Sequence, residues 1–143
     1  MFIDSFIEQF KKNDKKIAMV WEDKETTYSW LVNRIIFWEE KLKKSGVTFG
    51  SRVVLDATFS PESISIIFAL IENGCIIIPL FKPKNSLKEE IFQECKVNFI
   101  ISFKNSFKIE SINKKMLTHQ LFDELNHRKH PGLILISSGT SGK

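Results

Sequence analysis

The stretch RVVLDATFSPESISIIFALIENGCIIIPL, residues 52–80, decides the fold of this chain. It begins and ends with apolar runs, at 52–58 and 75–80, that are typical of buried strands. The Ser-Pro-Glu segment at 60–62 supplies an N-cap, a first-turn proline and a first-turn acid, so it predicts the start of a helix. Gly74 is well placed to end that helix. Two buried strands joined by a helix predict a right-handed βαβ unit with parallel strands.

The helix of this unit is rich in apolar residues. At helical spacing we assign its buried face to Ile64, Ile67, Phe68 and Ile71. We expect this face to pack against the sheet or against a further layer of protein.

The preceding segment also alternates between strand and helix patterns. Residues 17–29 have the pattern of a hairpin with its turn at Lys24 and Glu25. We expect Ser29 to cap the following helix and Gly46 to end it. One stripe of this helix is apolar and predicts its buried face: Leu31, Ile35, Trp38 and Leu42.

The same alternation continues after residue 80. The patterns predict helices at 86–96 and 116–126, and strands at 97–102 and 131–137. The polar stretch 104–115 is typical of a surface excursion. The sequence therefore predicts an α/β fold, in which a mostly parallel sheet carries helices on both faces.

The first fifteen residues predict a short amphipathic helix (1–15). Its apolar positions recur at helical spacing: Phe2, Ile3, Phe6, Ile7 and Phe10. Its polar face is not strongly basic, so we favour packing on the body of the protein over binding to a membrane surface. The segment lacks the uninterrupted apolar core of a signal peptide, and we find no apolar run long enough to span a bilayer.

Composition argues against several other classes of function. The net charge of +4 comes mainly from scattered lysine pairs, with only three arginines, which argues against nucleic-acid binding. The two cysteines, Cys75 and Cys95, give no disulfide framework, so we expect a reducing, cytoplasmic location. Cys75 lies in an apolar run and is interpreted as a core residue rather than a nucleophile.

Isolated polar residues give weak signals. His127 and His130 are three positions apart without a third ligand nearby, so we predict no metal site. His119 is interpreted as a helix-surface residue. Asp56 ends a predicted strand, where site residues of doubly wound sheets occur, but its neighbours in sequence support no role.

The segment LILISSGTSGK, residues 133–143, carries the strongest chemical signal. An apolar strand runs directly into small polar residues: Ser137, Ser138, Gly139, Thr140, Ser141, Gly142 and Lys143. Glycines allow several backbone N–H groups to converge on one anion, and hydroxyls add donors. The Walker A spacing fails, because its first glycine would have to be Ser137. Taken alone, the segment fits a phosphate-binding loop and a plain turn equally well.

The segment SSGTSGK resembles the phosphate-loop signature of the adenylate-forming (AMP-binding) superfamily. This superfamily includes acyl-CoA synthetases, the adenylation domains of peptide synthetases, and luciferases. Two upstream stretches, TYSWL at 27–31 and the stretch at 60–80, resemble further family segments in the same order. The sequence departs from the family after Leu80, where Phe81-Lys82-Pro83 replaces a frequent acidic residue. The resemblance extends from about Ile17 onward.

This resemblance implies that residues 1–143 are the N-terminal part of the AMP-binding large domain, with no second domain, ending inside the phosphate loop. In the family this loop holds the β- and γ-phosphates of ATP while a carboxylate attacks the α-phosphate. Coenzyme A or the phosphopantetheine of a carrier protein then accepts the acyl group. The implied partners are therefore the remainder of the enzyme, a small carboxylic acid and a carrier protein.

The resemblance also places the Mg²⁺ ligand and the catalytic residues downstream of this loop. We therefore assign no catalytic residue and no metal ligand to this chain, and expect it to be inactive by itself. If it lacks a covering body, its apolar surfaces should self-associate as a two-fold dimer, through Ile64, Ile67 and Phe68 or through 133–136. Two alternatives stay open: a free-standing α/β module that binds a nucleotide or a partner without catalysis, and a different NTPase.

Overall fold

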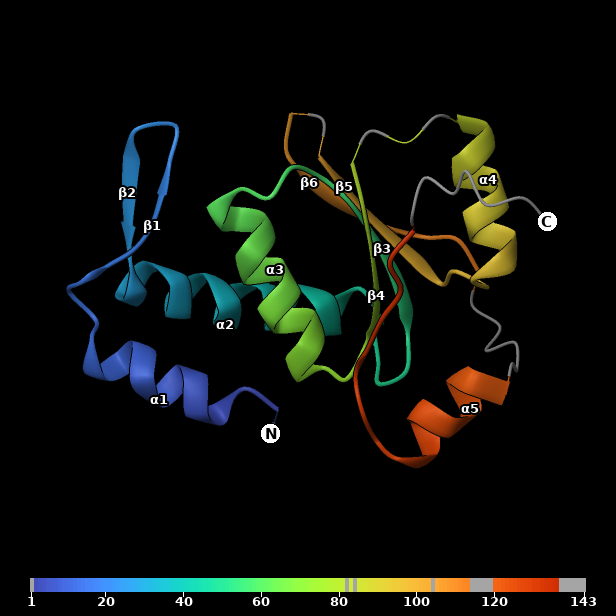
Figure 1. Ribbon diagram of the computed structural model, residues 1–143, viewed down its shortest axis with the longest axis horizontal. Coiled ribbons are helices and arrows are strands. Elements are labelled where there is room, and N and C mark those ends of the chain that lie inside the picture. The colour runs from blue at the N-terminus through green and yellow to red at the C-terminus, as the bar shows by residue number, and fades with distance from the viewer. Residues whose placement is uncertain (1, 82, 84, 104, 114–119, 137–143) are drawn as a thin grey trace.

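The chain has an α/β fold in the computed structural model, which describes residues 2–81, 83, 85–103, 105–113 and 120–136. Within these residues a five-stranded sheet carries helices on both faces, and a two-stranded hairpin stands apart from it (Figure 1). The predicted fold class is confirmed. None of the helices in the described residues combines the length and the apolar character needed to cross a membrane.

The N-terminal elements are a helix and a hairpin, as predicted. They are α1 (Asp4–Lys12), β1 (Ile17–Trp21) and β2 (Lys24–Thr27), with the two strands antiparallel. The predicted turn at Lys24 and Glu25 is wrong by two residues. Glu22 and Asp23 form the turn instead, with φ of 48° and 59°. Paired positive φ values twist a two-residue turn in the sense that the flanking strands require.

Helix α1 packs on the body of the protein, as we favoured. The backbone N–H of Ile3 donates to Glu72 Oε2 at 3.1 Å, and Ile3 itself is buried. The Phe10 ring meets Phe68 edge to face, with 5.7 Å between centroids. These contacts attach the N-terminal segment to the second half of α3.

Helix α2 (Tyr28–Lys44) buries the predicted stripe of Leu31, Ile35, Trp38 and Leu42. Its cap is Thr27 rather than Ser29, since Thr27 Oγ1 accepts a hydrogen bond from the backbone N–H of Trp30 at 3.2 Å. Thr27 has the extended backbone that an N-cap needs, whereas Ser29 already lies inside the helix. Gly46 follows the end of the helix with φ of 78°, as expected for a residue that terminates it.

The larger sheet has the strand order β6-β5-β3-β4-β7. Its strands are β3 (Arg52–Asp56), β4 (Ile76–Leu80), β5 (Phe99–Phe103), β6 (Phe107–Ser111) and β7 (Gly132–Leu133). Strand β3 pairs in parallel with β4 and β5, and β4 pairs in parallel with β7, while β5 and β6 are antiparallel. The predicted parallel βαβ unit is therefore confirmed.

Strand β6 corrects the prediction that 104–115 is a surface excursion. Phe107 and Ile109 are half-buried against the core, whereas Lys108 and Glu110 face solvent. A strand at the edge of a sheet needs only one apolar face. Its other residues are polar, so the strand is hard to recognise in the sequence.

The remaining helices are α3 (Pro61–Glu72), α4 (Asn85–Glu94) and α5 (Gln120–His127). Ser60 caps α3 as predicted, accepting a hydrogen bond from the backbone N–H of Ser63 at 3.3 Å. The predicted apolar face of α3 is wrong, because its four residues are only half-buried. The residues buried in its place are Ser63, Ser65, Ile66, Ala69 and Leu70. Nearly the whole circumference of α3 is apolar, so periodicity alone does not select the core face.

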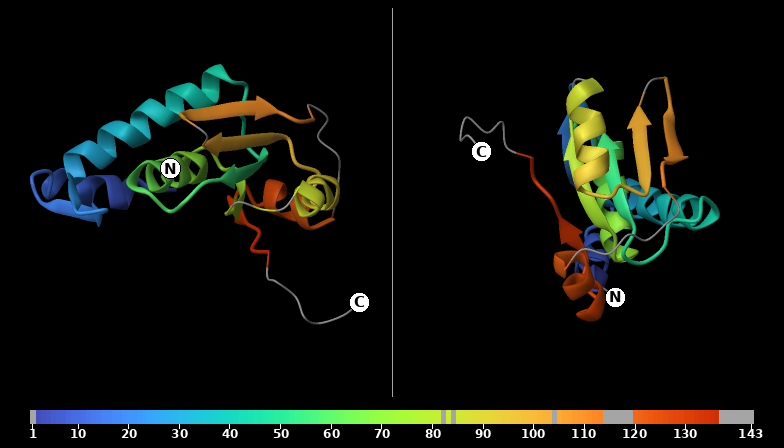
Figure 2. Two further views of the ribbon diagram at one scale, coloured as in Figure 1. Left: turned by 90° about the horizontal axis from the view of Figure 1, so that it is seen from above. Right: turned by 90° about the vertical axis from the view of Figure 1, so that its right-hand side faces the viewer.

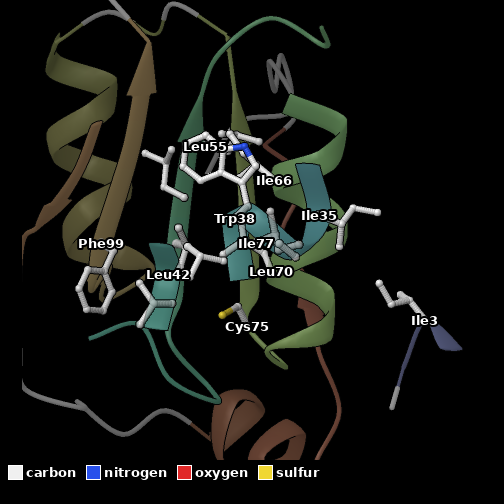
Figure 3. Close-up of a cluster of buried hydrophobic side chains, with 14 of the residues drawn as sticks. Ile3, Ile35, Trp38, Leu42, Leu55, Ile66, Leu70, Cys75, Ile77 and Phe99 are labelled. Carbon is white, nitrogen blue, oxygen red and sulfur yellow. The ribbon is translucent and has the colours of Figure 1, made fainter. Parts of the chain in front are cut away.

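The core is divided by the sheet into two clusters. On one face α2 and α3 cover the sheet, and Trp38, Leu70 and Ile77 interdigitate there (Figure 3). On the other face α4 contributes Ile91, which packs against Ile100 and other sheet residues. In β3, Val53 and Leu55 belong to the first cluster and Val54 to the second, because successive side chains of a strand point to opposite faces.

We expect the corrected face of α3 to govern stability. Replacing Ile66 with Ala should lower the free energy of unfolding by about 2–5 kcal/mol, because a fully buried side chain leaves a cavity. The matched change of the half-buried Ile64 should cost about 1 kcal/mol. Urea denaturation followed by circular dichroism measures both. A larger loss for Ile64 than for Ile66 would contradict the assignment.

Candidate functional site

The carboxyl ends of the parallel strands meet at one edge of the sheet. Strands β3, β4, β5 and β7 end there at Asp56, Leu80, Phe103 and Leu133. In open α/β sheets, ligands bind in crevices outside this edge. We call it the carboxyl edge.

Strand β7 runs toward this edge and leads into the predicted phosphate loop. Beyond Leu133 the chain stays beside β4, since the backbone N–H of Ile134 donates to the Ile77 carbonyl at 2.9 Å. Leu135 and Ile136 are exposed. The predicted loop lies outside the described residues: Ser137, Ser138, Gly139, Thr140, Ser141, Gly142 and Lys143. The structure thus describes the strand that precedes the predicted loop in the sequence.

Asp56 forms an ion pair at the carboxyl edge. Lys88 of α4 reaches its Oδ2 atom at 2.9 Å, and both side chains are mostly buried. The next residue, Ala57, donates its backbone N–H to the Leu80 carbonyl at 3.2 Å. The Asp56 carboxylate is therefore paired, and its ion pair with Lys88 ties α4 to the sheet.

The first turn of α3 forms a second polar cluster near this edge. The Glu62 carboxylate accepts hydrogen bonds from Arg34 Nε at 3.0 Å and from Trp38 Nε1 at 2.7 Å, and it also pairs with Arg34 Nη2. Glu62 additionally lies where the positive end of the helix dipole favours an acid. This cluster joins α2 to the start of α3.

The two cysteines and the candidate metal ligands among the described residues form no site. Burial raises the pKa of the Cys75 thiol to about 12, so it stays protonated, as expected of a core residue. Burial, and then Glu94, raises the pKa of Cys95 as well. His127 and His130 are exposed, and no cluster of metal-ligating side chains occurs among the described residues, which exclude His119.

Two side-chain partners at this edge were not predicted from the sequence. Lys88 lies 32 residues from Asp56, and Arg34 lies 28 residues from Glu62. Neither pair has local spacing, so only the crossover connections bring the residues together. The predicted fold would have placed Asp56 at the edge, but it would not have selected a lysine on the next helix.

Comparison with known proteins finds similarity at the level of structure. No family model matches the sequence, and no curated protein matches it. The chain is similar to the N-terminal subdomain of Klebsiella oxytoca NpsA in complex with 3-hydroxyanthranilyl-AMSN. The TM-score is 0.71 and the identity 19%, over 97% of this chain and 38% of that chain.

Two further solved structures show the same likeness. One is NpsA-ThdA, an artificially fused adenylation-PCP di-domain from Klebsiella oxytoca, with a TM-score of 0.69, 15% identity, and 94% and 28% of the two chains covered. The other is VinN in complex with L-aspartate, with a TM-score of 0.67, 14% identity, and 95% and 35% covered.

These matches define the class of fold. The chain has the architecture of the N-terminal subdomain of adenylation enzymes, and it spans about a quarter to two fifths of the matched chains, between 27% and 38%. The likeness runs through nearly the whole of this chain in several matches, so it is not confined to the βαβ unit.

We expect Cys75 to be inert in the folded protein. In a Cys95→Ser variant, Ellman's reagent at about pH 8 should label Cys75 only after unfolding, because a buried thiol with a pKa of about 12 supplies almost no thiolate. The same variant in concentrated guanidinium chloride serves as the fully reactive control. Rapid labelling of the native protein would show that Cys75 is accessible and reactive.

Proposed function

We propose that residues 1–143 form the N-terminal part of the AMP-binding large domain of an ATP-dependent, carboxylate-activating ligase. The observation that carries this proposal is the segment SSGTSGK at 137–143, which directly follows the chain beside β4 at the carboxyl edge. The similarity in fold to an adenylation subdomain supports the same proposed function independently of that segment. Fold alone does not imply an activity, so the segment decides the class of chemistry.

In this proposal the residues from Ser137 to Lys143 bind the β- and γ-phosphates of ATP. Backbone N–H groups and small hydroxyls are suited to a polyphosphate, and Lys143 adds positive charge. ATP would supply the α-phosphate that the substrate carboxylate attacks, giving an acyl-adenylate and pyrophosphate. The Mg²⁺ ligand and the catalytic groups belong to the remainder of the enzyme, so this chain is inactive alone.

The proposed acceptor of the acyl group is the thiol of coenzyme A or of a carrier-protein phosphopantetheine. A similar solved structure is an adenylation-PCP fusion, which supports a carrier protein as partner. The proposed substrate is a small carboxylic acid, in keeping with a neighbour in complex with L-aspartate. We propose a cytoplasmic location, where ATP and reduced thiols are abundant.

Replacing Thr140 with Val in the polypeptide that contains this chain should lower ATP–pyrophosphate exchange by about a hundredfold or more. The reason is that the hydroxyl is proposed to contact the departing pyrophosphate. Thr48→Val is the matched control, since Thr48 is exposed and precedes the opposite end of β3. Unchanged exchange in the Thr140 variant would make it a plain turn residue and would favour the non-catalytic module.

We also propose that the isolated chain self-associates through the segment 133–136. Leu133 and Leu135 are 62% and 71% exposed, and Ile136 is 40% exposed. Within the described residues β7 pairs only with β4, so its other side is an open strand edge. The other predicted surface, at Ile64, Ile67 and Phe68, is half-covered by the chain's own packing and is the weaker candidate.

Light scattering should therefore find a dimer at micromolar concentration. Leu135→Glu should shift it to monomer, because a charge on an exposed strand edge blocks pairing. The control is Val20→Glu, which alters an equally exposed side chain on the separate hairpin and should leave the dimer intact. A wild-type monomer, or equal effects of both variants, would contradict this surface.

A further inference from the structure

A cavity of about 560 Å³ lies between α2, the first turn of α3 and the β5–β6 hairpin. Strand β6 runs beside α2 in the left view of Figure 2, and the cavity lies on this side of the sheet. Trp21 and Glu22 of the first hairpin complete its rim. A volume of several hundred Å³ is typical of pockets that hold small organic ligands.

Four aromatic rings form a continuous wall of this cavity. Phe37 meets Trp38 edge to face at 5.6 Å, and Trp38 meets Phe107 edge to face at 5.7 Å. Phe103 extends the series, with its centroid 4.9 Å from that of Phe107. Phe37 and Phe103 are 37% and 54% exposed, so part of each ring is available to a ligand. Such a wall favours a planar, aromatic ligand that can stack.

The charges around the wall favour a negative group on that ligand. Arg34 lies 4.1 Å from the Phe37 centroid, but its charge is already paired with Glu62. Lys41 Nζ lies 4.9 Å from the Phe37 centroid and 5.3 Å from that of Trp38. No carboxylate pairs with Lys41 among the described residues. An ammonium group held beside aromatic rings is positioned for the carboxylate of a stacked ligand.

We propose that this cavity binds a small planar aromatic carboxylate, which stacks on Phe103, packs against the tilted ring of Phe107 and places its carboxylate at Lys41. This site is proposed in addition to the proposed function and does not rest on it. A cationic ligand is disfavoured because the protein's own Arg34 and Lys41 already lie at the Phe37 ring. Glu22 at the rim and Lys41 are both exposed, so water screens both charges and the carboxylate is expected to add only a small part of the affinity.

Binding of 2-naphthoate to the 143-residue chain tests the proposal. Trp21 and Trp38 line the cavity, so titration should quench tryptophan fluorescence, and calorimetry should give the same dissociation constant. The uncharged naphthalene-2-carboxamide should bind about threefold to fivefold more weakly, because it cannot pair with Lys41. Equal binding of the two compounds would overturn the carboxylate assignment, and no binding of either would overturn the site.

Two pairs of variants locate the ligand. Lys41→Gln should weaken naphthoate binding by about threefold to fivefold, whereas Lys43→Gln, on the same helix but outside the lining, should not. Phe103→Ala should weaken both compounds by about threefold to tenfold, whereas Phe59→Ala, a similarly exposed ring outside the lining, should not.

A further substitution tests the sign of the charge effect. Glu22→Gln should leave naphthoate binding unchanged or slightly stronger, since it removes a negative charge from the rim. Circular dichroism checks that each variant is folded. Weaker naphthoate binding after Glu22→Gln, or no effect of Lys41→Gln, would overturn the assignment of the carboxylate to Lys41.

Discussion

Strand β3 is the constraint on which the rest of the structure depends, because it pairs in parallel on both of its sides. Parallel neighbours cannot be joined by a tight turn, so the chain must cross over a face of the sheet each time. It does so with α3 on one face and α4 on the other. The strand is consequently buried from both sides, which explains why RVVLD contains no regular alternation of polar and apolar residues.

The same constraint creates the carboxyl edge. Since β3, β4, β5 and β7 run in one direction, the residues that follow them gather at one end of the sheet. The start of α3 and the segment after β7 belong to this end, although more than 70 residues separate them. Each crossover helix also brings its own side chains to the edge, and Lys88 of α4 reaches Asp56 in this way.

Local signals predicted much of this fold. The cap at Ser60, the glycines after α2 and α3, and the buried strands are properties of a few neighbouring residues, so they can be read without the tertiary structure. The buried face of α3 could not be read in this way. Ser65 is buried, but its Oγ donates to the Glu62 carbonyl at 2.6 Å, so its polarity is satisfied within the helix. Polarity therefore did not mark the outer face.

The errors elsewhere have other causes. The alternation Phe107-Lys108-Ile109-Glu110 is the pattern of an edge strand, and only its polar surroundings led us to interpret it as surface. The phosphate loop stays a prediction from resemblance, since its residues alone fit a turn equally well. The aromatic cavity could not be predicted, because its walls come from four segments that share no motif. Sites of that kind emerge only from packing.

Glu62 connects the cavity to the carboxyl edge. Its carboxylate holds Arg34 and Trp38 at the cavity wall, while its backbone belongs to the first turn of α3. The residues just before it, from Asp56 to Ser60, leave the edge and then line the cavity at Thr58 and Ser60. A molecule in the cavity would therefore contact the connection that also shapes the edge. This connection is anchored to the sheet, because the backbone N–H of Ala57 donates to the Leu80 carbonyl at the end of β4.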